Sequence, residues 1–369
     1  MNDETLPRFV AMQYSPRSLI EPKGVALHFR IHAAIWRRAN NNCKLFFYTY
    51  ILCAVVHKHA SFFSGIGGFD IGFEAAGIKS VSQCEVDPFC IQVLRKHFPN
   101  VPKFQDIRAL DATAIPYANI WSGGFPCQDV SLARMGPRPG LAGRRTGLFY
   151  DFARLLEQHS PRVVLLENVA GLLSSHEGRD FAVVTRTLAQ LGYSVGWRVL
   201  NSQHFGVPQS RQRVFIVGCH RDRTGPLQIL FESNGSTGDH SKNRQNGTKS
   251  LSPFKEIIRG AGEENPVFQK IAYCLYATSA RHTGTDWSRT YVSYPDQGEV
   301  RRLMPVECEG IMGFPKDWTQ LEEVNHDEDI DSPRYHALGN AVTPPVVAAL
   351  ALRIRDYLDT PAKIYEVNK

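Results

Sequence analysis

The chain has 369 residues, of which 43% are hydrophobic and 21% charged, so it is long enough for one or two soluble globular domains with a sizeable core. Its net charge of +6 is a weak indication of nucleic-acid binding, because residues 1–59 carry +5 of it and the remaining residues only +1. Eight scattered cysteines without a C-x-x-C pair argue against a zinc ribbon, and predict reduced thiols, no bound metal and a cytoplasmic protein.

Residues 1–58 differ from the rest of the chain and are predicted to be an N-terminal extension. They contain an apolar run of 12 residues, Leu45 to Val56, which is shorter than the roughly 20 residues that span a membrane. The simplest interpretation of the run is a buried strand or helix, and no membrane association is expected. We favour instead a loosely attached leader, or one that is not native to the protein, for example because its start codon was assigned too far upstream.

From residue 59 onward, strands and helices are predicted to alternate. A short strand at residues 60–63 leads through the turn Ser64-Gly-Ile-Gly-Gly68 into a helix over residues 69–76. A second strand follows at residues 79–85, and Asp87 caps a helix with a proline at its first position. Further strands are expected at 119–122, 162–166 and 214–218, and helices at 181–191 and 344–357. This order predicts an α/β fold with a doubly wound, mostly parallel sheet.

Residues 221–300 interrupt that alternation, because they are rich in Gly, Ser, Thr, Asn and Arg. We expect them to form a small separate domain, while residues 59–220 and residues 301–369 together build the α/β domain.

The first turn of the sheet is a candidate ligand site. Gly65, Gly67 and Gly68 let a ligand approach the backbone at a helix N-terminus, and ligands of open α/β sheets bind at the carboxyl ends of the strands. Glu85 ends the next strand, where a carboxylate accepts hydrogen bonds from ribose hydroxyls. Asp106 is placed either to accept from an adenine amino group or to cap a helix. Such a turn also serves nicotinamide and flavin enzymes, although the full G-x-G-x-x-G pattern is missing.

A cysteine and an acid follow two of the apolar strands. Cys127, in Gly123-Gly-Phe-Pro-Cys-Gln128, is predicted on a loop at a strand end. A free cysteine is more often a small core residue, but the surrounding glycines and polar partners favour a nucleophile here. Glu167 ends an apolar strand, a position where acids are rare unless they cap a helix or form an ion pair.

Two basic features complete the pattern. Arg211 and Arg213 alternate, so in an extended segment both guanidinium groups share a face and can converge on one site, although a solvated basic stretch is commoner. The glycine-rich segment after Cys127 holds four arginines and no acid between residues 134 and 145. That composition favours a loop that closes over a phosphate backbone rather than an ordinary solvated loop.

Taken in order, these residues resemble the DNA cytosine-C5 methyltransferase family. The resemblance covers roughly residues 59–357, and several motifs in the right order are far more specific than any one alone. The motifs are Phe62-Phe-Ser-Gly-Ile-Gly-Gly68, Glu85-Val-Asp87, Gln105-Asp-Ile107, Gly124-Phe-Pro-Cys-Gln128, Glu167-Asn-Val169, Gln209-Ser-Arg-Gln-Arg213, Arg302-Leu-Met-Pro-Val-Glu-Cys-Glu-Gly-Ile-Met-Gly-Phe-Pro315 and Gly339-Asn-Ala-Val342. The resemblance implies a Rossmann-like methyltransferase fold, with residues 221–300 as its target-recognition domain.

The resemblance also implies S-adenosylmethionine as methyl donor and a flipped-out cytosine of duplex DNA as substrate. Cys127 would attack C6 of the base, Glu167 would hold a proton at N3, and Arg211 and Arg213 would bind O2 or a phosphate. The implied cofactor residues are Phe63, Gly65, Gly67, Gly68, Glu85, Asp106, Ile107, Pro126, Asn340 and Val342. Of these, Phe63 and Val342 are equally well explained as core residues.

The DNA-contacting residues implied are Gln128, Ser131, Arg134, Arg138, Arg144, Arg145 and Gln209. Ten basic and nine acidic residues in 221–300 favour base reading over general phosphate binding. Within that segment, the polar cluster around Trp287, residues 281–289, is either a major-groove reader or a loop packed on its own domain.

Three alternative functions share part of this pattern. An RNA (tRNA) cytosine-C5 methyltransferase of the same fold would keep the chemistry, but the Cys-Phe-Thr signature of that branch is absent from the chain. A non-enzymatic DNA-binding relative would be expected to have lost Cys127, Glu167 or the glycine turn. A nicotinamide oxidoreductase leaves Cys127, Glu167 and the paired arginines unexplained. We therefore expect a monomeric cytoplasmic enzyme, bacterial or phage-encoded, of the restriction-modification or self-protection type.

Overall fold

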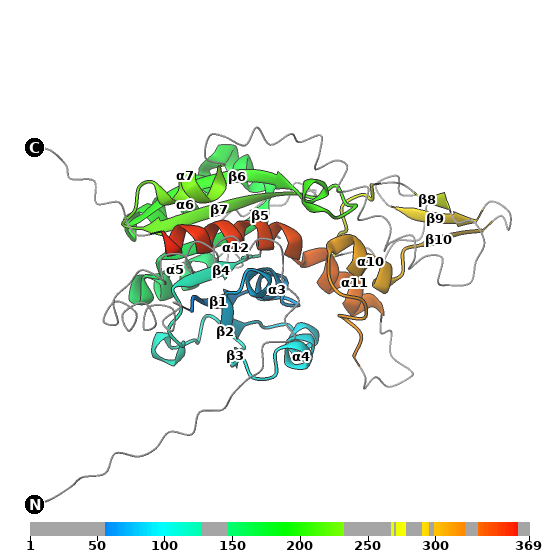
Figure 1. The fold of residues 1–369 in the computed structure, drawn as a ribbon, viewed down its shortest axis with the longest axis horizontal. Coiled ribbons are helices and arrows are strands. Elements are labelled where there is room, and N and C mark those ends of the chain that lie inside the picture. The colour runs from blue at the N-terminus through cyan, green and yellow to red at the C-terminus, as the bar shows by residue number, and fades with distance from the viewer. Residues whose placement is uncertain are drawn as a thin grey trace, which may run out of the picture. The chain divides into compact units, whose positions relative to one another are not determined.

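The central sheet of the computed structural model has seven strands in the order β3-β2-β1-β4-β5-β7-β6 (Figure 1). The strands are β1 (Lys58–Phe62), β2 (Lys79–Cys84), β3 (Lys103–Phe104), β4 (Ile120–Gly123), β5 (Val163–Val169), β6 (Tyr193–Asn201) and β7 (Gln212–His220). All neighbours pair in parallel, except that β7 is antiparallel to both β5 and β6. The structure describes residues 56–126, 147–231, 267–268, 271–277, 290–294, 299–321 and 331–360.

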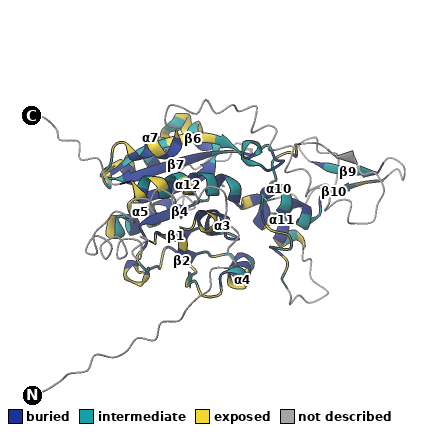
Figure 2. Ribbon diagram, in the orientation of Figure 1, coloured by how far each residue is buried: buried dark blue, intermediate teal, exposed yellow. Residues whose placement is uncertain are grey.

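Helices cover both faces of this sheet. The described α-helices are α3 (Gly68–Ala75), α4 (Pro88–His97), α5 (Leu148–His159), α6 (Arg179–Gln190), α7 (Gly225–Leu230), α10 (Pro305–Met312), α11 (Asp331–Asn340) and α12 (Pro344–Asp359). Of these, α10 and α11 pack with α4 and β9 in a separate hydrophobic cluster. Apolar residues of α5 and α6 pack with Val164 and Leu166 of β5, whereas those of α3, α7 and α12 pack with Val163 and Leu165. Because successive strand residues point to opposite faces, a strand covered on both sides is buried almost throughout, as the dark central strands in Figure 2 show.

The predicted doubly wound α/β fold is therefore confirmed. Its helix starts follow the expected local chemistry: the Asp87 side chain caps α4 by accepting a hydrogen bond from Cys90 N at 2.9 Å, with Pro88 at the first helical position. The last described helix, α12, packs against α3, the first one (Figure 1). The first and last described helices therefore lie in the same helical layer.

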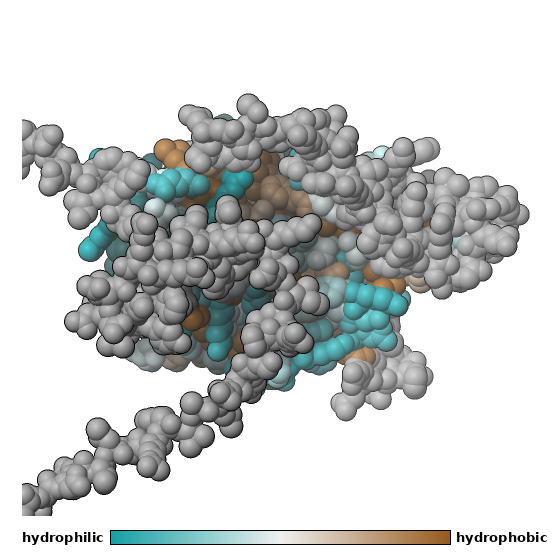
Figure 3. All heavy atoms as spheres, viewed as in Figure 1, coloured by the Kyte–Doolittle hydropathy of each residue, from teal (hydrophilic) through white to brown (hydrophobic). Residues whose placement is uncertain are grey.

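Two features of the sheet differ from the sequence prediction. Strand β6 was not predicted, because it lies at the sheet edge and its side chains are only partly buried, which removes the strong apolar signal. Strand β7 begins at Gln212 rather than at residue 214, so Arg213 lies inside the strand. Three large apolar side chains are exposed at this edge: Trp197 of β6, Leu227 of α7 and Phe231 just after α7. Figure 3 shows hydrophobic atoms in the region of these two elements.

A second, antiparallel sheet contains β8 (Val267–Phe268), β9 (Tyr291–Tyr294) and β10 (Glu299–Arg302). It lies largely within the segment that interrupts the α/β alternation. Arg301 of β10 donates to both carboxylate oxygens of Glu307 on α10, at 2.9 and 3.0 Å, and so ties this sheet to the next helix.

Candidate active site

A cavity of about 530 Å³ opens at the carboxyl ends of β1, β2, β4 and β5. Its volume is typical of small-molecule sites, and its position is where open α/β sheets bind their ligands. It is lined by ten of the residues predicted for the cofactor or the chemistry: Phe63, Gly65, Glu85, Asp106, Ile107, Pro126, Glu167, Arg211, Arg213 and Asn340. Parallel strand ends thus bring together residues that are far apart in the chain.

At one end of the cavity, the Glu85 carboxylate is held by backbone donors. Oε2 accepts from Gly65 N at 2.7 Å, and Oε1 accepts from Val86 N and Asp87 N, each at 2.9 Å. Burial raises the pKa of the Glu85 carboxyl above its ordinary value, while these N–H donors oppose the shift. The carboxylate is therefore fixed in direction, and with three N–H donors on its roughly four lone pairs it keeps one, on Oε2, for a ligand hydroxyl.

The three turn glycines have different roles. A Cβ on Gly65 would meet no atom within 4 Å, so its backbone is open to the cavity. A Cβ on Gly67 would lie 2.8 Å from the Phe98 ring, and one on Gly68 would lie 2.6 Å from the Val342 carbonyl oxygen. Gly67, Gly68 and Val342 are absent from the cavity lining, and Val342 is a buried core residue. In this structure these three residues pack against their neighbours, and their expected contact with a cofactor stays a prediction.

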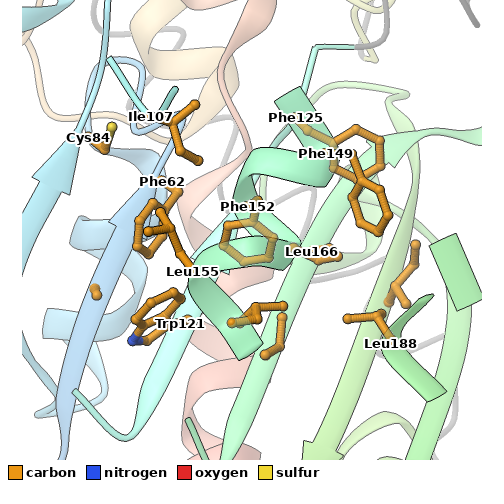
Figure 4. Packing of buried hydrophobic residues seen from close by; sticks show 14 of the residues in the cluster. Phe62, Cys84, Ile107, Trp121, Phe125, Phe149, Phe152, Leu155, Leu166 and Leu188 are labelled. Carbon is orange, nitrogen blue, oxygen red and sulfur yellow. The ribbon is translucent and has the colours of Figure 1, made fainter. Parts of the chain in front are cut away.

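Asp106 lies at the cavity rim in a bidentate pair with Arg108. Its Oδ2 accepts from Arg108 Nη2 at 2.7 Å, and Oδ1 accepts from Arg108 Nε at 2.9 Å. This pairing lowers the pKa of the Asp106 carboxyl, which stays charged at the rim. The neighbouring Ile107 is buried, and it belongs to the hydrophobic cluster drawn in Figure 4. An adenine amino group would have to share Asp106 with Arg108.

At the other end of the cavity, Glu167 pairs with Arg213. Arg213 Nε lies 3.1 Å from Glu167 Oε1, and the two side chains are only 15% and 11% exposed. The antiparallel register explains the pairing: Glu167 lies opposite Phe215, so Arg213, two residues before Phe215, is its diagonal neighbour on the same face. Burial raises the pKa of the Glu167 carboxyl, and the charges of Arg213 and then Arg211 oppose that rise.

Arg211 and Arg213 line the same cavity and both reach Cys274 Sγ, at 3.4 and 3.9 Å, but their other partners differ. Arg211 is only 1% exposed, and its guanidinium donates to the carbonyl oxygens of Leu275, Gly339 and Ala341 at 2.9, 2.9 and 2.8 Å. Its Nη groups are therefore occupied by backbone acceptors, which corrects its expected role as a ligand of the base or a phosphate. The shared strand face is right, but the groups opposite the two side chains differ.

Gln209 is also corrected. Its side chain is completely buried: Nε2 donates to Ile311 O at 3.2 Å, and Oε1 accepts from Leu275 N at 3.3 Å. These contacts join three chain segments inside the protein, so the predicted DNA contact does not fit this side chain. The sequence carries no sign of this, because the partners come from elements that follow it by 60 residues or more.

The strand end that leads to the predicted nucleophile is firmly anchored. Asn168 Nδ2 donates to Phe125 O at 3.2 Å, and the Phe125 ring packs on Phe149 of α5 with ring centroids 5.3 Å apart (Figure 4). Sequence reasoning did not assign a role to Asn168 or Phe125, although both lie inside the quoted motifs. The predictions for Cys127, Gln128, Ser131, Arg134, Arg138, Arg144 and Arg145 fall outside the described residues.

The family model described as "C-5 cytosine-specific DNA methylase" matches residues 57–246 and 232–356 of the chain. These two matches together span most of its length, and they include every motif quoted above. The chain belongs to the C-5 cytosine-specific DNA methylase family. It is therefore an enzyme, and the cavity between Glu85 and Glu167 is the candidate active site of a methyltransferase.

Relatives of this methylase are type II methyltransferases of bacteria. M.NgoBI of Neisseria gonorrhoeae is 42% identical over 310 residues, covering 80% of this chain and 92% of the relative. M.MspI of a Moraxella species is 33% identical over 323 residues, covering 82% of this chain and 71% of the relative. M.DsaV of Dactylococcopsis salina is 29% identical over 329 residues, covering 85% and 90%.

Solved structures support the methylase fold. The S. pombe Dnmt2 methyltransferase superposes with a TM-score of 0.59 at 17% identity, covering 82% of this chain and all of that one. The Entamoeba histolytica methyltransferase EhMeth gives 0.58 at 17% identity, covering 83% and 99%. At such low identity, the likeness concerns the fold alone.

Within the described ranges, no group of three or more His, Cys, Asp or Glu side chains is arranged to hold a metal ion. Among the same residues, one helical stretch, 331–359, is long and apolar enough to span a membrane by length and composition, but 67% of its most apolar 18-residue segment is buried inside the protein. Such burial is typical of a core helix.

Proposed function

We propose that this enzyme transfers a methyl group from S-adenosylmethionine to C5 of a flipped-out cytosine in duplex DNA, with Cys127 as the nucleophile. One observation carries the proposal: a single cavity has a backbone-anchored carboxylate, Glu85, at one end and the buried Glu167–Arg213 pair at the other. The first end suits a nucleoside with free hydroxyls, and the second suits a polar ring that gains charge during reaction.

The described residues fit S-adenosylmethionine. Phe63 and Ile107 supply apolar surface, the open backbone at Gly65 admits a ligand, and Glu85 presents acceptors for ribose hydroxyls. Asn340 lines the cavity and supplies an amide for the methionine end. When bound, S-adenosylmethionine supplies the methyl group that C5 of the base takes up from its sulfonium.

The chain's own residues would act on the base in a fixed order. The Cys127 thiolate forms a bond to C6, which places electron density on C5, since the thiolate and not the thiol is the nucleophile. Glu167 holds a proton at N3, so that the ring does not accumulate negative charge. After C5 is methylated, its proton leaves and the Cys127–C6 bond breaks, which restores the aromatic ring and the free thiolate.

The arginine next to this acid has a defined part. The Arg213 guanidinium contacts Glu167 Oε1 through Nε and lies at the same end of the cavity. It would orient the carboxyl so that Oε2 faces the base. Its Nη1 donates to Gln212 O at 2.8 Å and both Nη atoms lie 3.9 Å from Cys274 Sγ, so an approach of Nη2 to O2 would replace its long contact with sulfur. Gly124 lies beside this carboxyl: a Cβ there would lie 3.5 Å from Glu167 Oε2, which is an ordinary van der Waals contact.

The domain boundaries, the DNA contacts and the biological setting of the enzyme are proposals too. Residues 221–300 would form the target-recognition domain, residues 59–220 and 301–369 the catalytic domain, and residues 1–58 an N-terminal extension. The segment that follows Cys127 would contact the duplex through residues Gln128, Ser131, Arg134, Arg138, Arg144 and Arg145. Because the relatives are named type II methyltransferases, we propose a monomeric cytoplasmic enzyme of a bacterial or phage restriction-modification system.

The choice of nucleic acid is tested directly. Purified protein is incubated with tritium-labelled S-adenosylmethionine and either mixed-sequence duplex DNA or total transfer RNA. We expect label on cytosine of the DNA, and bisulfite sequencing then reads out the methylated sequence. Label on transfer RNA alone would replace the proposal with the RNA-directed alternative, and label on neither would refute it.

A further inference from the structure

The Arg211 guanidinium lies where three separate chain segments meet. Its Nη1 donates to Leu275 O at 2.9 Å and to Cys274 Sγ at 3.4 Å, and its Nη2 donates to Gly339 O at 2.9 Å and to Ala341 O at 2.8 Å. Hydrogen bonds from a charged donor are among the stronger ones in proteins, and an arginine fork holds several acceptors in a fixed plane. One side chain therefore joins residues 274–275 to the end of α11.

The backbones of these two segments are in close contact. A Cβ on Gly339 would lie 2.3 Å from both Tyr276 C and Ala277 N, so only glycine permits this approach. On the other side, residues 271–275 pair with the segment before Arg211: Ser210 N donates to Ala272 O at 2.9 Å, and Ala272 N donates to Pro208 O at 2.7 Å. Arg211 thus completes a junction that backbone contacts begin.

Each segment at this junction connects to a different half of the proposed reaction. Asn340, between the two carbonyl groups that accept from Arg211 Nη2, lines the cavity and is proposed to contact the cofactor. Residues 271–277 belong to the segment proposed to recognise the target. Arg213, two residues farther along, contacts Glu167 itself. The two arginines therefore have different main partners: Arg213 contacts Glu167, and Arg211 contacts backbone carbonyl groups.

We propose that Arg211 is a positioning residue that fixes the cofactor-side turn, residues 339–341, against the recognition-side segment, residues 271–277. The inference rests on the proposed function for the identity of the two ligands, but the junction itself is a property of the described residues. A lysine in this place would keep the charge and lose the fork, and could not hold Leu275, Gly339 and Ala341 together. Burial of the guanidinium lowers the pKa of Arg211, which agrees with a group enclosed by carbonyl oxygens rather than by water.

The test uses the full chain with Arg211→Lys and a matched control, Arg198→Lys. Arg198 also donates from Nη1 to a backbone carbonyl, that of Leu230, at 3.0 Å, but it is absent from the cavity lining. Amide hydrogen exchange is measured without any ligand. We expect faster exchange in residues 271–277 and 339–341 together in Arg211→Lys, unchanged exchange in β5, and no change at either segment in Arg198→Lys.

A second measurement covers function and the case of a poorly folded variant. Calorimetric binding of S-adenosylhomocysteine should weaken about tenfold in Arg211→Lys, the effect of losing one charge-assisted hydrogen bond. Gly339→Ala, which disturbs the same junction from the other side, should weaken binding and raise exchange in the same two segments. Faster exchange in only one segment, a rise that extends to β5, or unchanged binding despite faster exchange would each overturn the proposal. If the wild-type chain bound no S-adenosylhomocysteine, the proposed cofactor would be refuted, whereas the exchange result would still decide the role of Arg211.

Discussion

Arg213 Nε and Glu167 Oε1 lie 3.1 Å apart on neighbouring antiparallel strands, and both side chains are largely removed from water. Desolvation favours the neutral form of the carboxyl, whereas the guanidinium favours its charged form, and the balance leaves the pKa of Glu167 above its ordinary value. An acid whose pKa is raised in this way holds a proton more readily than an ordinary glutamate, as a donor to a ring nitrogen requires.

Glu167→Gln should slow methyl transfer by about 10²- to 10⁴-fold, the usual contribution of a positioned general acid. The amide preserves size and can still donate, but it cannot exchange a proton with N3. Binding of S-adenosylhomocysteine should be unchanged, because Glu85 and Gly65 form the other end of the cavity. Single-turnover kinetics and calorimetry measure the two effects, and an unaltered rate would remove Glu167 from the mechanism.

Arg213→Met should shift the pH dependence of the reaction. The Arg213 charge lowers the pKa of Glu167, so its removal raises that pKa further. If the protonated acid is the active form, the rate falls as pH rises through its pKa, and this falling limb should move to higher pH in the variant. The measurement is a kcat profile from pH 5 to 9. A limb that moves to lower pH, or stays in place, would contradict the assignment.

Cys127→Ser should abolish methyl transfer while duplex binding is retained, because the hydroxyl is a far weaker nucleophile than a thiolate. Duplexes that carry 5-fluorocytosine should trap the wild-type enzyme covalently, because fluorine on C5 cannot leave as a proton. Denaturing gels report the trapped complex, and the serine variant is the control. Residual transfer by that variant would rule out Cys127 as the nucleophile.

Two glycines of the same turn should respond differently to alanine. Gly65→Ala places a methyl group in open space at the cavity, so it should weaken S-adenosylhomocysteine binding, with about 1 to 2 kcal/mol of backbone strain at φ +53°. Gly68→Ala pushes a methyl group to 2.6 Å from Val342 O, and should destabilise folding by about 1 to 3 kcal/mol without changing the affinity of the folded protein. Urea unfolding and calorimetry separate the two outcomes, and equal effects on binding would contradict the division.

The burial of His59 should make the folded protein less stable in acid. Its side chain is fully buried between Ser80 Oγ at 3.1 Å and Ser122 Oγ at 2.7 Å, and desolvation lowers the pKa of the imidazole to about 3. The folded state therefore binds this proton more weakly than the unfolded state, whose pKa is about 6.5. The resulting stability is complete above pH 6.5 and is lost as pH falls toward 3.

The measurement compares urea unfolding of the wild-type chain and His59→Gln at pH 7 and pH 5. The wild type should lose about 2 kcal/mol more than the variant over this interval, since each pH unit below 6.5 costs about 1.4 kcal/mol. Asp70, whose Oδ1 lies 4.0 Å from His59 Nδ1, titrates with the opposite sign but is present in both proteins. Equal losses in the two proteins would show that His59 takes up its proton without unfolding.

The local features of the fold could be predicted from the sequence because their causes are local. The Asp87 cap, the glycine turn and the order of strands and helices depend on residues within a few positions of one another. The same reasoning placed Glu85 and Glu167 at strand ends, and parallel strand ends meet at one edge of a sheet. Most predicted cofactor residues consequently line one cavity.

The tertiary structure alone decided what faces each side chain. Arg211 and Arg213 are equivalent in the sequence pattern, yet one lies against Glu167 and the other against carbonyl groups at the end of α11. Gln209 is as polar as any surface residue, but partners more than 60 residues away bury it. Strand periodicity specifies the side of the sheet to which a residue points, whereas the strand, helix or loop that covers that side is set by long-range packing, which no local pattern contains.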